Sequence, residues 1–124
     1  AFIPFVGIVR DEDGIDGLSF DIYEPILTQW FESWQKRVAP DNAILFMAHS
    51  RGDVPNHTSS YISAVVSPQR KAALRIINDF VEDFKANAPI WKYDLVGGER
   101  IYAKSRSLPL NGAGLLADTK ENDA

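Results

Sequence analysis

The segment "KANAPIWKYD", residues 85–94, marks a point where a helix has to end and an extended segment has to begin. Pro89 has a fixed φ and no backbone N–H, and it biases the preceding Ala88 toward the extended region. Lys85 and Lys92 lie on either side of this turn. Two solvated surface lysines would need no special geometry, but the turn also allows both ammonium groups to lean toward one pocket.

Two amphipathic stretches predict helices. The first covers residues 24–38, with Pro25 at a first helical position and apolar residues at three- and four-residue spacing, which favours a core face over a base-stacking platform. The second runs to about Asn87, with Ser67 as the predicted N-cap and Pro68 as the first helical residue. Its apolar face consists of Ala73, Ile77, Phe80, Val81 and Phe84.

The remaining segments have the β-branched or alternating patterns of strands. They are residues 1–10, 18–23, 42–49, 59–67, 91–96 and 99–104. Residues 18–23 are expected to pair with the first strand, and residues 50–58 to form a loop. Gly97 and Gly98 suit a tight hairpin turn between the last two strands. Strands in pairs and hairpins predict an α+β fold, with two helices packed on one antiparallel sheet.

The composition predicts one globular domain, because 124 residues that are 45% hydrophobic can build one core. We assign residues 1–107 to this domain and residues 108–124 to a mobile tail. A net charge of -4 argues against binding to nucleic acid or to an anionic membrane. With no apolar run long enough to span a bilayer and no signal-peptide pattern, a soluble cytoplasmic protein is expected. Because the chain has no cysteine, it has no thiolate of its own.

Four cations are candidate site residues: Arg10, Arg70, Lys85 and Lys92. They could be solvated surface charges, but Arg70 is expected in the first turn of a helix, where the dipole opposes a cation unless an anion binds there. Two histidines, His49 and His57, without cysteine make a metal site improbable. No glycine-rich phosphate loop is present, so no cofactor is predicted.

Several motifs resemble the large, catalytic subunit of molybdopterin synthase. They are "FVGIVR", "LSFDIY", His49 with Gly52, "YISAVVSPQR" and above all "KANAPIWKYD", and the resemblance covers roughly residues 5–102. It implies an α+β hammerhead-type fold and a homodimer within a heterotetramer. It also implies a small ubiquitin-like partner whose Gly-Gly tail carries a thiocarboxylate. The family's strand and helix before "FVGIVR" are expected to be missing.

The implied activity is transfer of sulfur from this tail to cyclic pyranopterin monophosphate, which forms the dithiolene of molybdopterin. The resemblance implies that Lys85 and Lys92 are catalytic, with Lys85 the acid/base or covalent-contact residue and Lys92 the charge stabiliser. Arg10 and Arg70 would hold the phosphate and the pterin. Gln69 and His49 complete the predicted substrate-binding set.

Two departures from the family pattern support an alternative. Ser50 stands where the family has arginine after the histidine, and Gln69 stands where the family has histidine before Arg70. Glutamine can only form hydrogen bonds, so a proton carrier that titrates near neutrality is lost at this position. The alternative is a non-catalytic binding module that keeps the fold and the groove for the Gly-Gly tail.

Overall fold

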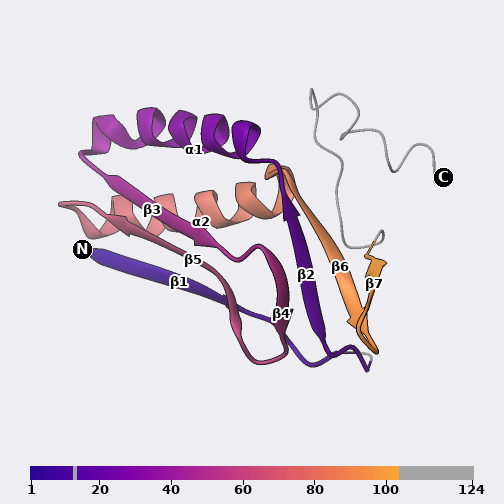
Figure 1. Ribbon diagram of the computed structural model, residues 1–124. Coiled ribbons are helices and arrows are strands. Elements are labelled where there is room, and N and C mark those ends of the chain that lie inside the picture. Colours follow the sequence, from indigo (N-terminus) through magenta and orange to yellow (C-terminus); the bar gives the residue numbers. More distant parts are fainter. Residues whose placement is uncertain (13, 104–124) are drawn as a thin grey trace.

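Two antiparallel sheets lie side by side, and both helices cover one face of the first sheet (Figure 1). This computed structural model describes residues 1–12 and 14–103. Sheet A has the order β1-β5-β3, and sheet B has the order β4-β2-β6-β7. The predicted α+β class is therefore confirmed, but the expectation of one sheet is wrong. The predicted tail, residues 108–124, lies outside the described residues.

Sheet A consists of β1 (Phe2–Ile8), β5 (Ser59–Val66) and β3 (Ile44–His49). Sheet B consists of β4 (Gly52–Pro55), β2 (Gly17–Ile22), β6 (Ile90–Val96) and β7 (Glu99–Tyr102). The hairpin between β6 and β7 turns at Gly97 and Gly98, both with positive φ, which confirms that prediction.

The predicted pairing of residues 18–23 with the first strand is wrong, because β2 pairs with β4 and β6. The connection from β1 carries the chain away from sheet A, and Asp16 donates its backbone N–H to Leu95 on β6. At Gly17 an added Cβ would lie 2.3 Å from the Val54 carbonyl oxygen, so only glycine permits this approach to β4. Strand β4 was expected to be loop, since Gly52 and Pro55 at its ends obscure the strand pattern.

Helix α1 (Glu24–Val38) has the predicted bounds, and a short 3₁₀ turn, η1 (Ala39–Asp41), follows it. Helix α2 (Arg70–Asn87) ends where predicted but begins later, with Gln69 as the N-cap, so the prediction for Ser67 and Pro68 is wrong. The buried Ser67 hydroxyl accepts a hydrogen bond from the Gln69 backbone N–H, and the Ser67 N–H donates to Ala1. Ser67 therefore directly follows the end of β5 and does not cap the helix. Neither α1 nor α2 is long and apolar enough to cross a membrane.

The main core lies between the helices and sheet A, as the amphipathic patterns predicted. Phe80 on α2 is fully buried, and its ring contacts the rings of Trp30, Phe31 and Trp34 on α1. These aromatic side chains are thus core residues and not a stacking platform.

Asp83 joins the two helices through a carboxylate at the edge of this core. One oxygen accepts hydrogen bonds from the indole N–H groups of Trp30 at 2.9 Å and Trp34 at 2.7 Å. Asn87 donates to the other oxygen at 2.6 Å. Partial burial acts to raise the pKa of Asp83, but the hydrogen bonds and the Arg37 charge outweigh it and lower this pKa.

Replacing Asp83 with alanine should lower the free energy of unfolding by roughly 1 to 3 kcal/mol, because two partly buried indole N–H groups lose a charged acceptor. Chemical denaturation followed by tryptophan fluorescence measures this. Asp79→Ala, one helical turn earlier at an exposed position, is the matched control. Equal stability of the two variants would contradict the assignment.

Candidate functional site

A cavity of about 370 Å³ lies where the C-terminal end of α2 meets both sheets. This volume is within the range of small-molecule sites. The charged residues in its lining are Arg10, Glu12, Lys85 and Lys92. Aromatic residues from four elements line it, and they are Phe5 on β1, Phe20 on β2, Tyr61 on β5 and Phe84 on α2; the last three, which surround His49, form what we call the aromatic wall.

The turn at Pro89 brings the two lysines to the lining of the same cavity, an arrangement that the sequence allowed. Lys85 lies in the last turn of α2, where the helix dipole favours a cation. Lys92 lies on β6 opposite Phe20 of β2, whose ring belongs to the cavity wall. Pro89 itself is fully buried, which fixes the separation of the helix and the strand that carry these two ammonium groups.

Arg10 lines the mouth of the cavity. It follows the end of β1 at Ile8, so it does not close the strand itself as expected. Its side chain is 81% exposed and forms an ion pair with Glu12 at 2.9 Å. An exposed guanidinium of this kind can exchange Glu12 for an anionic ligand at small cost.

His49 is the predicted site residue with the most enclosed surroundings. Its ring packs edge-on against Phe20, with centroids 4.7 Å apart, and it also contacts Tyr61 and Phe84. Nδ1 lies 2.7 Å from the Ser50 carbonyl oxygen. Burial is the main cause that lowers the pKa of His49, and the charge of Lys92 acts in the same direction against the Ser50 hydrogen bond.

Gln69 and Arg70 are not among the residues that line this cavity. They lie at the N-terminal end of α2, whereas the cavity lies at its C-terminal end. An 18-residue helix separates the two ends by about 27 Å. The predicted set thus divides into a cavity group, formed by Arg10, His49, Lys85 and Lys92, and a distant pair.

The aromatic wall was missed by sequence reasoning. Phe84 was assigned to the core face of its helix, and Tyr61 was treated only as part of a strand. The pairing of β3 with β5 places Tyr61 beside His49, and no local pattern in the sequence contains this register. Burial raises the pKa of Tyr61 to about 12, so its hydroxyl remains protonated at neutral pH.

The described residues, 1–12 and 14–103, contain no group of three or more histidine, aspartate or glutamate side chains that could hold a metal ion. The cavity instead combines cations with an aromatic wall, an arrangement that suits an anionic ligand with a planar ring.

Comparison with known proteins identifies the family of this chain. The family model described as MoaE protein matches residues 1–87. The molybdopterin synthase catalytic subunit of Helicobacter pylori 26695 is 56% identical over 117 residues, which cover 94% of this chain and 81% of the relative. The chain therefore belongs to the family of molybdopterin synthase catalytic subunits, and the resemblance seen in the motifs is confirmed.

Solved structures agree with this assignment. In the complex of subunits 1 and 2 of the molybdopterin-converting factor from Helicobacter pylori 26695, the matching chain has a TM-score of 0.87 and 56% identity. The match covers 94% of this chain and 80% of that one. Molybdopterin synthase from Staphylococcus aureus has a TM-score of 0.74 at 24% identity, covers 82% of this chain and 78% of that one, and shares the fold.

The lowered pKa of His49 predicts a pH-dependent stability. Below pH 6.5 the unfolded chain binds a proton at this residue before the folded chain does, so the free energy of unfolding should fall as the pH drops from 7 to 5. His49→Gln should reduce this fall, and His57→Gln, at the exposed second histidine, should not. Urea denaturation at several pH values measures the effect. Parallel pH profiles for wild type and His49→Gln would contradict it.

Proposed function

We propose that this chain transfers sulfur from the C-terminal thiocarboxylate of a small ubiquitin-like partner to cyclic pyranopterin monophosphate. The observation that carries the proposal is the convergence of Lys85 and Lys92 on one cavity with an aromatic wall. Both the thiocarboxylate and the substrate phosphate are anions, so one cationic cavity can receive both. The relative solved as a complex of subunits 1 and 2 supports a small-subunit partner.

Each ligand has a matching part of the cavity in this proposal. An extended Gly-Gly tail can enter a narrow channel because it has no side chains. Lys85 acts as the acid/base or covalent-contact residue, and Lys92 stabilises developing negative charge. Arg10 at the mouth binds the phosphate, while the aromatic wall receives the planar pterin. Residues 1–107 act as one domain, and the reaction takes place in the cytoplasm.

The competing function is a binding module that docks the tail without turnover. Ser50 and Gln69 favour it, since the family pattern has arginine and histidine at these positions. The two functions differ in one measurable respect, because only an enzyme depends on the terminal sulfur. The test mixes the purified chain, a Gly-Gly partner in carboxylate or thiocarboxylate form, and cyclic pyranopterin monophosphate. Partner binding in both forms with dithiolene formed from neither would leave only the binding module.

Lys85→Ala and Lys92→Ala should each lower the rate of dithiolene formation by an amount equivalent to about 2 to 4 kcal/mol, because each removes a cation that stabilises negative charge developing in the cavity. The control is Lys36→Ala, which removes an exposed lysine on α1 far from the cavity lining. Circular dichroism should show an intact fold in all three variants. Normal turnover by Lys85→Ala would exclude it from the mechanism.

The homodimer of the proposed enzyme has a candidate contact surface, the outer face of sheet A. This is the face opposite the helices, and β1, β3 and β5 contain no aspartate, glutamate, lysine or arginine. Its exposed apolar side chains are Phe2, Val6, Ile8, Ile44, Phe46, Ile62 and Val66. A large uncharged apolar face is typical of an interface, and a two-fold contact between identical faces is self-complementary.

Such a dimer gives Gln69 and Arg70 a role. One end of the outer face is the row Phe2, Val66 and Ile44, which adjoins the N-terminal end of α2 through the Ser67 to Ala1 hydrogen bond. The other end of β1 adjoins the cavity. When two copies pack face to face in opposite directions, the N-terminal end of α2 in one copy approaches the cavity of the other. We therefore propose that Arg70 and Gln69 contribute to the cavity of the partner chain.

Mixed dimers test this arrangement. Coexpression of Lys85→Ala with Arg70→Ala should recover about one quarter of the wild-type number of active cavities. About half of the dimers are hybrids, and one of the two cavities in each hybrid has both an intact Lys85 and an intact Arg70 from the partner chain. Coexpression of Lys85→Ala with Lys92→Ala is the control and should recover none, since both lysines line the cavity of their own chain. Dithiolene formation per purified dimer is the measurement. No recovery in the first mixture would place Arg70 outside the partner's cavity.

A further inference from the structure

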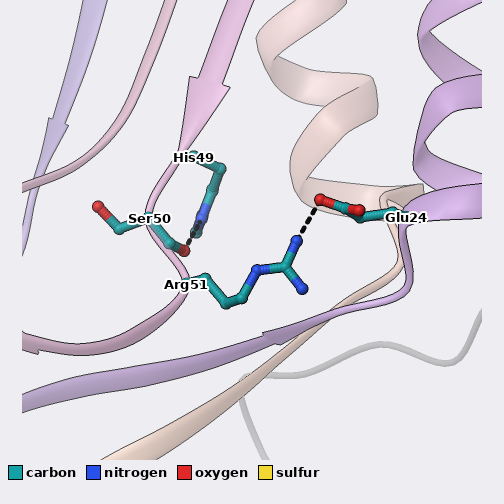
Figure 2. A network of polar contacts seen from close by, with 4 residues as sticks. All are labelled: Glu24, His49, Ser50 and Arg51. Carbon is teal, nitrogen blue, oxygen red and sulfur yellow. Dashed lines mark hydrogen bonds and ion pairs between the residues drawn. The ribbon is translucent and has the colours of Figure 1, made fainter.

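One hydrogen bond, between the His49 ring and the Ser50 backbone, determines which ring nitrogen of His49 carries the hydrogen. Nδ1 lies 2.7 Å from the Ser50 carbonyl oxygen, which can only accept, so Nδ1 carries the hydrogen (Figure 2). Nε2 makes no hydrogen bond with any residue that the structure describes, and the ring lines the cavity. In the neutral ring Nε2 is therefore an acceptor with a lone pair available to a ligand.

The Ser50 carbonyl is held in place from two sides. The Ser50 backbone N–H donates to the Ser60 carbonyl oxygen at 2.8 Å, which ties this residue to β5. The next residue, Arg51, forms an ion pair with Glu24 at the start of α1 (Figure 2). This pair connects the segment after β3 to a helix, so Arg51 is a positioning residue for the carbonyl that orients His49.

The groups around His49 favour the neutral ring. Phe20 from β2, Tyr61 from β5 and Phe84 from α2 enclose it. The charged lining residues on neighbouring elements are Lys85 on α2 and Lys92 on β6, both cations. No carboxylate is among the side chains packed on the ring, because Glu12 lies at the mouth with Arg10.

Two other side chains of the lining, Tyr61 and Glu12, have oxygen atoms that could accept a proton, but neither is well suited to do so. The Tyr61 hydroxyl stays protonated because burial raises the pKa of Tyr61 to about 12. Glu12 is engaged by Arg10 at 2.9 Å. Within the described residues His49 is thus the one enclosed, neutral base of the cavity, and the lowered pKa keeps it unprotonated near neutral pH.

Sulfur transfer creates a need for such a base. When the thiocarboxylate sulfur bonds to a carbon of the substrate, an oxygen substituent of that carbon leaves with the electron pair of its bond. The partner's terminal acyl group then remains attached to the sulfur as a thioester. Release requires water, whose oxygen bonds to the acyl carbon as the carbon–sulfur bond to the acyl group breaks. The thiolate leaves with the electron pair, one proton of the water goes to a base, and the new carboxylic acid loses its other proton to solvent.

We propose that His49 is the general base of this hydrolysis, accepting the proton of the attacking water at Nε2 and thereby freeing the partner's tail from the sulfurated substrate. The proposal rests on the proposed function. It separates the chemistry of the cavity into two parts, because Lys85, as the acid/base or covalent-contact residue, and Lys92, as the charge stabiliser, act in sulfur attack, whereas His49 acts in acyl release.

The decisive experiment is a single turnover with thiocarboxylated partner and cyclic pyranopterin monophosphate, followed by intact-mass analysis. In His49→Gln a covalent partner–substrate adduct should accumulate, should be cleaved by hydroxylamine as a thioester, and should decay about 100-fold more slowly than in wild type. The rate of decay in wild type should fall at acidic pH, and this dependence should vanish in His49→Gln. His57→Gln, with the same substitution at an exposed position, should behave as wild type.

The outcomes are distinguishable from failure of the proposed function. If wild type forms no dithiolene, the proposed function fails. If wild type is active and folded His49→Gln releases the partner at the normal rate without an adduct, only the role of His49 is overturned. If His49→Gln does not fold, nitrogen-15 NMR of the wild-type protein tests the proposal by showing which ring nitrogen of His49 carries the hydrogen. A protonated Nε2 and an unprotonated Nδ1 in neutral His49 would also overturn the proposal.

Discussion

The buried turn at Pro89 is the constraint on which the rest of the structure depends. Proline ends α2, and Ala88 in the extended region directs the chain into β6. The Pro89 carbonyl accepts a hydrogen bond from the Tyr23 backbone N–H at 3.1 Å, just before α1. One fully buried residue thus connects the end of α2, the start of α1 and the strand that carries Lys92. A shift of this turn would therefore move both helices and, with α2 and β6, both lysines.

Local sequence patterns were sufficient to predict most helices and strands, but not which strands pair with each other. Both helices, the β6–β7 hairpin and the convergence of Lys85 and Lys92 follow from periodicity, proline and glycine, which act over a few residues. The separation into two sheets depends on Gly17 approaching β4 and on hydrogen bonds across long sequence separations. No window of the sequence contains these contacts. The N-cap error at Ser67 has the same origin, since Ser67 is held by Ala1.

The site shows the same division. Arg70 and Lys85 were recognisable because a cation at a helix end is a local signal. The aromatic wall was not, because Phe20, Tyr61 and Phe84 come from three elements and read individually as ordinary apolar positions. Gln69 and Arg70 were placed with the lysines by resemblance, yet the length of α2 keeps the two groups apart in one chain. The proposed contact with a second copy would bring the two groups together.

The two departures from the family pattern, Ser50 and Gln69, differ in whether the side chain at that position matters. At Ser50 the contact with His49 comes from the backbone carbonyl, a group that every residue has, so the side chain at this position does not decide the tautomer of His49. The neighbouring Arg51 points to Glu24 on α1 and supports the same backbone (Figure 2). At Gln69 the backbone caps α2 and donates to the Ser67 hydroxyl, so any role in a partner's cavity has to come from the amide side chain. Glutamine there can form hydrogen bonds but cannot carry a proton near neutral pH, whereas the imidazole of His49, enclosed in its own chain, is chemically capable of both.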